Sequence, residues 1–108
     1  MTTFDDREKA FENKFAHDGG MEFKARARRN RLLGEWVATD LLGMEGEAVK
    51  DYAAAVVKAD LEEKGDDDVI RKVHADLEAA SLDFSDHRIE KKLVELMAVA
   101  KGQLMDEV

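Results

Sequence analysis

Apolar side chains recur along this 108-residue chain at the three- and four-residue spacing of amphipathic helices. The clearest stripe, in residues 45–64, consists of Val49, Tyr52, Ala53, Val56 and Val57. A helix expected to start after Ser85, which is a favourable N-cap, carries the stripe Ile89, Leu93, Leu96, Met97, Ala100 and Leu104. No segment shows the alternation of a convincing strand, and proline is absent. The pattern predicts an all-α fold.

Two further segments are predicted to be helical. Residues 21–42 are basic in their first half and apolar in their second, and they form one helix only if Gly34 is tolerated. Asp66, Asp67 and Asp68 are interpreted as the N-cap and negative first turn of a helix that carries Val69, Ile70, Val73 and Leu77. Because the connections are short, neighbouring helices should be antiparallel. We therefore predict a small four-helix bundle in residues 19–108.

Residues 1–18 are predicted to form a separate amphipathic arm. Thr3 is a plausible N-cap, and Phe4, Phe11 and Phe15 lie on a single line of an otherwise polar helix. An isolated helix of this length is marginal in water, so we expect the arm to be flexible and mobile when the protein is free. The alternative is that its phenylalanines pack onto the bundle as ordinary core.

The junction between arm and bundle has the composition of a hinge. Gly19 and Gly20 permit a wide range of backbone conformations there. His17 precedes them, and its imidazole titrates in the physiological range, which offers a weaker hypothesis of pH sensitivity.

Charge is distributed unevenly along the chain. The net charge is -8, yet residues 1–31 carry eight basic and six acidic side chains. Five cations gather in this part, at Lys24, Arg26, Arg28, Arg29 and Arg31. They are either a solvated helix face or a binding surface for an acidic protein. Nucleic acid is disfavoured as a partner, because the rest of the chain is strongly acidic and Phe23 is the lone aromatic residue beside the cluster.

The sequence contains no recognisable set of catalytic residues. Without cysteine there is no disulfide, thiolate metal site or thiol nucleophile, and the expected compartment is the cytoplasm. The three histidines lack the spacing of a helical metal site, and His74 is interpreted as a half-buried packing residue. The sequence begins without the features of a secretory signal and contains no apolar run that suits membrane insertion. We expect a protein that is not an enzyme and needs no metal or cofactor.

Three runs in the first third of the chain, residues 4–11, 14–18 and 23–36, closely resemble the ζ subunit of the F-type ATP synthase of α-proteobacteria. The resemblance implies a regulatory subunit that inhibits ATP hydrolysis. Its arm would enter a catalytic interface between the α and β subunits near γ. It also implies a monomer when free and a peripheral location at the inner membrane when bound.

The residues expected to contact these subunits fall into two groups. The arm contributes Phe4, Asp5, Arg7, Glu8, Lys9, Phe11, Lys14 and Phe15. The basic stretch contributes Lys24, Arg26, Arg28, Arg29 and Arg31. Two other functions stay open. One is a weak adenine-nucleotide sensor, with the cations on the phosphates and Trp36 or Tyr52 stacked on the base. The other is a helical adaptor unrelated to the ATP synthase.

Overall fold

The computed structural model describes residues 3–17, 19–60 and 65–107. These ranges contain five α-helices, namely α1 (Thr3–His17), α2 (Gly19–Trp36), α3 (Glu47–Ala59), α4 (Asp67–Ala79) and α5 (Asp86–Glu107). A short π-helical segment, η1 (Val37–Leu41), continues α2. No strand occurs among the described residues. The predicted all-α class is therefore confirmed, as a small helical bundle.

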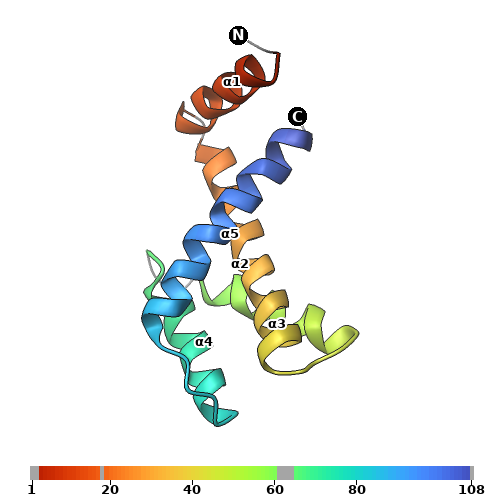
Figure 1. The fold of residues 1–108 in the computed structure, drawn as a ribbon, viewed down its shortest axis with the longest axis vertical. Coiled ribbons are helices and arrows are strands. Elements are labelled where there is room, and N and C mark those ends of the chain that lie inside the picture. Colours follow the sequence, from red (N-terminus) through yellow and green to blue (C-terminus); the bar gives the residue numbers. More distant parts are fainter. Residues whose placement is uncertain (1–2, 18, 61–64, 108) are drawn as a thin grey trace.

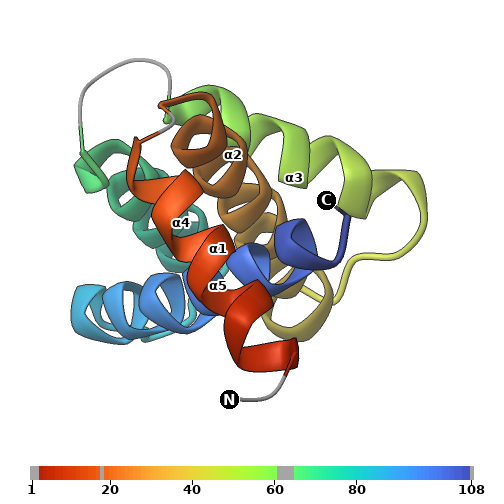
Figure 2. The same cartoon turned by 90° about the horizontal axis from the view of Figure 1, so that it is seen from above.

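The molecule is elongated, with principal extents of 50 × 27 × 24 Å. Figure 1 shows α2 and α5 crossing along its length, with α3 and α4 packed around one end. Helix α1 lies at the other end, where α2 starts and α5 finishes. Figure 2, seen from above, shows α1 lying over that end of the bundle.

The main core lies at the α3–α4 end of the molecule. It brings together the apolar stripes that the sequence predicts on four helical segments, and its buried members are Leu33, Val37, Val56, Val69, Val73, Leu77, Ile89, Leu93 and Leu96. Trp36 packs against this core and meets Phe84 edge to face, with ring centroids 5.8 Å apart. Burial of these stripes supplies the main apolar stabilisation of the bundle.

Gly34 is tolerated within α2 because it lies at the contact between α2 and α3. A Cβ atom built at this position would come 2.6 Å from the Cα atom of Ala53, which is far inside van der Waals distance. Glycine and alanine thus let the two helix backbones approach closely. The chain then continues through η1, where the amide of Leu42 donates to the carbonyl of Val37 at 2.9 Å.

The ends of the helices agree with the sequence prediction in one case and differ in another. Ser85 caps α5 as predicted, since its Oγ accepts a hydrogen bond from the Arg88 amide at 3.3 Å. Asp66 stands at the N-cap position of α4, with Asp67 and Asp68 in the first turn as predicted, but its side chain makes no cap hydrogen bond. Its carboxylate binds Arg29 instead.

We predict that Gly34→Ala destabilises the protein by about 1–3 kcal/mol, because overpacking the α2–α3 contact outweighs the better helix propensity of alanine. Gly102→Ala is the matched control. It lies inside α5, and an added Cβ there meets nothing within 4 Å. This control should be neutral or gain up to about 1 kcal/mol. Urea unfolding followed by Trp36 fluorescence measures both, and equal stabilities for the two variants would contradict the close-contact explanation.

Candidate partner interface

Two phenylalanines of the arm, Phe11 and Phe15, face the bundle. Phe11 is only 5% exposed and packs in a small apolar cluster with Met21, Ala25 and Leu104. Phe15 packs against the same cluster, with its ring centroid 6.2 Å from that of Phe11. For these two residues the structure shows the alternative that the sequence left open, namely packing onto the bundle.

The charged side chains described on the arm are exposed. Glu8, Lys9 and Lys14 are all exposed on α1. Nothing is described for the side chains of Phe4, Asp5 and Arg7, which were also predicted to bind the partner. Over its described portion the arm is therefore amphipathic, with Phe11 and Phe15 packed on the bundle and charged groups in contact with solvent.

The predicted hinge coincides with the boundary between α1 and α2. Helix α2 begins at Gly19, and an added Cβ there would meet nothing within 4 Å. The backbone of Gly19 is not in the left-handed region, so the observed conformation does not require glycine. The His17 side chain lies outside what the structure describes. Movement at Gly19 and Gly20, and pH sensitivity through His17, remain predictions.

A groove that the sequence did not indicate runs beside the arm. It has a volume of about 700 Å³ and lies among α1, α4 and α5. Its apolar wall includes Leu93, Val94 and Met97 of α5, and Val94 is 75% exposed. In the sequence, Val94 is adjacent to the core stripe of α5, and nothing in the pattern indicates that it is exposed in a groove.

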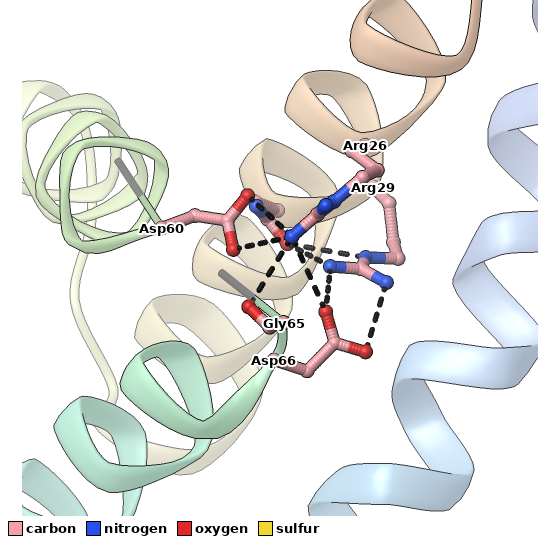
Figure 3. A network of polar contacts seen from close by, with 6 residues as sticks. Arg26, Arg29, Asp60, Gly65 and Asp66 are labelled. Atoms are coloured by element: carbon pink, nitrogen blue, oxygen red, sulfur yellow. Dashed lines mark hydrogen bonds and ion pairs between the residues drawn. The ribbon is translucent and has the colours of Figure 1, made fainter. Parts of the chain in front are cut away.

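The basic stretch of α2 is largely engaged inside the fold. Arg29 is 5% exposed; its Nη2 donates to Asp66 Oδ1 at 2.7 Å, and its Nε donates to Asn30 Oδ1 at 3.1 Å. Arg26 donates to Asp60 Oδ1 at 3.0 Å and to the Gly65 carbonyl oxygen at 3.2 Å. Figure 3 shows the two guanidinium groups side by side, between Asp60 and the Gly65–Asp66 turn. This network joins α2 to both ends of the connection between α3 and α4.

Arg28 makes a similar tie to the end of α5. Its Nη2 donates to Glu107 Oε2 at 3.0 Å, and its Nη1 contacts the other carboxylate oxygen. The hydrogen bond from Arg28 lowers the pKa of Glu107, with smaller contributions from the charges of Arg28, Arg31 and Lys24. The stability that this pair adds is present above the ordinary glutamate pKa and is lost as the pH falls through the lowered value.

Lys24 and Arg31 are the exposed members of the basic stretch. The Nε atom of Arg31 lies 3.8 Å from a carboxylate oxygen of Glu35, a loose surface pair. Phe23 is 62% exposed and lines a shallow hollow of about 600 Å³ together with Lys24, Arg31 and Val57. The surface presented to solvent here thus combines one aromatic ring with two cations.

The acidic partners of the basic stretch are the residues that sequence reasoning missed. Asp60, Asp66 and Glu107 lie between 34 and 79 positions away along the chain from the arginines that they bind. An excess of acidic residues in the later part of the chain was visible, but periodicity does not state which carboxylate meets which arginine.

The histidine and acidic side chains of the described residues bear on a possible metal site. Within the described ranges, no group of three or more histidine or acidic side chains could hold a metal ion. His74 is half-buried as predicted, and its Nδ1 lies 2.9 Å from Asp86 Oδ1. In the described part of the chain, no helix is both long and apolar enough to cross a membrane.

Together these features define a small all-α protein whose surface chemistry suits contact with another protein. The family model of the ATPase inhibitor subunit zeta matches residues 1–103, and the chain belongs to this family. The family is one of inhibitor subunits, so its members are regulatory rather than catalytic.

The comparison with solved structures supports the same fold. A protein whose structure was determined in solution by NMR is 52% identical to this chain. The match covers 82% of this chain and 99% of that one, with a TM-score of 0.71. A comparison with curated proteins finds no match.

We predict that Asp66→Asn destabilises the bundle by about 1–2 kcal/mol, because it leaves the buried Arg29 guanidinium without its anionic partner. The loss of stability is small because the Asp66 side chain is 40% exposed and water replaces part of the interaction. Asp67→Asn, at an exposed neighbouring position, is the control and should lower stability by at most about 0.5 kcal/mol. Equal losses in thermal unfolding would show that only helix-dipole effects operate.

Proposed function

We propose that this protein inhibits ATP hydrolysis by the F-type ATP synthase, by inserting α1 into a catalytic interface between the α and β subunits near γ. The observation that carries the proposal is the amphipathic α1 itself, which presents Phe11 and Phe15 on one face and charged groups on the other. Membership of the inhibitor subunit zeta family supports the inhibitory role. The cytoplasmic location at the inner membrane follows from attachment to the enzyme.

The arm needs help from other contacts to bind tightly. Burying the phenylalanines contributes about 1.5–3 kcal/mol each. Association itself costs about 4–15 kcal/mol, and ordering the arm adds to that cost. Charged contacts from the exposed side chains of Glu8, Lys9 and Lys14 are the natural complement to this apolar burial.

The bundle supplies a second contact in this proposal. Because Arg26, Arg28 and Arg29 are paired within the fold, the exposed cations available to an acidic subunit surface are Lys24 and Arg31. Exposed Phe23, which lines the same hollow, adds an aromatic anchor of the kind that is enriched at binding hot spots. This surface follows the arm directly in sequence, so both can reach one partner.

The positions of the aromatic rings do not favour the nucleotide-sensor hypothesis. The Tyr52 hydroxyl donates to Asp76 Oδ2 at 2.8 Å, and burial and this carboxylate raise the tyrosine pKa. Trp36 packs on the main core, with Lys92 Nζ 4.6 Å from its ring centroid. Both rings proposed for base stacking thus have partners within the fold.

We predict that deleting residues 1–17 abolishes inhibition of ATP hydrolysis by the isolated catalytic sector, while the bundle keeps its fold. The main core contains no member from the deleted segment among the described residues, so its unfolding transition should persist. A matched variant, Phe15→Ala, should weaken inhibition several-fold because it removes one apolar anchor. Full inhibition by the truncated protein would rule out the arm mechanism.

We also predict that the double variant Lys24→Glu with Arg31→Glu inhibits several-fold less well at low ionic strength, and that the difference shrinks as salt is added. Lys50→Glu with Lys58→Glu changes the net charge equally on exposed positions of α3 and serves as the control. If both doubles lose inhibition to the same extent, the effect is general repulsion rather than contact through this surface.

A further inference from the structure

The apolar face of α1 is needed for two contacts, one within this chain and one with the catalytic sector. Phe11 and Phe15, the side chains that the proposed function places against the catalytic sector, are packed within this chain. Their site on the bundle, here called the arm dock, consists of Met21, Ala25, Met97, Leu104 and Met105. A single helix face cannot be buried against the arm dock and against another protein at the same time.

We propose that the arm dock is an autoinhibitory binding site for the protein's own arm, which competes with the catalytic sector for Phe11 and Phe15. This inference rests on the proposed function. In the closed form the arm is held on α2 and α5, and in the open form the same residues are free to bind the enzyme.

The contact at the arm dock is specific rather than a general apolar collapse. Phe11 enters a site whose floor, Ala25, is fully buried and whose wall, Leu104, is 5% exposed. Beside it, Lys101 Nζ lies 4.4 Å from the centroid of the Phe15 ring, a cation–π contact from α5. The arm dock therefore offers an apolar site for Phe11 and a cation for the Phe15 ring.

The arm dock can open without unfolding the bundle. Within the described chain, the main core and the arm-dock cluster have no residue in common. The main core lies around α3 and α4, whereas α1 lies at the opposite end of the molecule (Figure 1). Release of α1 thus exposes a small cluster only, which places this opening at the low-energy end of local unfolding.

The closed form is also incompletely packed. The groove of about 700 Å³ runs along α1, and Phe11 forms part of its lining together with Glu8 and Glu12. A face that borders open space makes fewer dispersion contacts than one enclosed in a core. The contact therefore combines specific partners with limited packing, which suits reversible docking. We call this reversible docking of α1 on the arm dock the latch.

The latch sets the potency of the inhibitor. When only the open fraction of a protein binds its target, the apparent dissociation constant is the intrinsic one divided by that fraction. Weakening the arm dock should therefore strengthen inhibition, because it raises the open fraction. If the residues of the arm dock only stabilised the fold, their substitution would weaken inhibition or leave it unchanged.

The test uses full-length variants on the bundle side of the contact. Leu104→Ala shortens a buried member of the cluster in which Phe11 packs. Lys101→Ala removes the cation over Phe15 from a partly exposed position. Val99→Ala is the control, since Val99 is 42% exposed on the same helix and belongs to neither cluster. Amide hydrogen exchange of residues 8–15 measures docking in the free protein, and ATP hydrolysis by the isolated catalytic sector measures potency.

For Leu104→Ala we expect faster exchange in α1 and a half-inhibitory concentration about tenfold lower than that of the natural protein. Lys101→Ala should shift both quantities the same way by about two- to threefold. Val99→Ala should match the natural protein in both assays. Trp36 fluorescence reports whether the main core stays folded, and Lys101→Ala decides the question if Leu104→Ala unfolds.

Two results would overturn the latch, and they differ in what they leave standing. If exchange in α1 accelerates but the natural protein and the variants inhibit equally, or if exchange does not change, the latch is wrong and the proposed function survives. If neither the natural protein nor any variant inhibits, both proposals fail together.

Discussion

The close contact between α2 and α3 at Gly34 and Ala53 is the constraint on which the rest of the arrangement depends. It places α2 as the central rod of the molecule. One end of α2, with Leu33, enters the main core, and the other end, with Ala25, forms the floor of the arm dock. Because both clusters are built on one continuous helix, the arm dock lies at a fixed distance from the main core.

Charge pairing completes this arrangement. Arg26 and Arg29 hold α2 to the connection between α3 and α4, and Arg28 holds it to the end of α5. Three of the five cations of the basic stretch thus form ion pairs that join α2 to other parts of the protein. What it leaves for a partner is the smaller surface around Lys24 and Arg31, next to exposed Phe23. The electrostatics of the bundle and the proposed binding site therefore share one helix but use different residues.

Periodicity predicted the helices and their buried faces well, because helix spacing states which side chains lie on one face. It did not predict what that face would meet. The stripe with Phe11 and Phe15 suits docking within the chain as well as binding in another protein, so the sequence left both open. Likewise, the local sequence correctly indicated that Asp66 precedes the first turn of a helix. It did not indicate that the Asp66 carboxylate binds a buried arginine 37 positions earlier in the chain. Long-range pairing of this kind depends on tertiary packing, which local pattern does not encode.

The central claim is that α1 leaves the arm dock when it inhibits the enzyme. The most direct measurement is the distance between spin labels on Asn13→Cys in α1 and Lys91→Cys in α5, which can be attached selectively because the chain has no natural cysteine. The account predicts a population at one docked distance in the free protein and a clear shift to another distance in the inhibited complex. An unchanged distance in a complex that no longer hydrolyses ATP would contradict it.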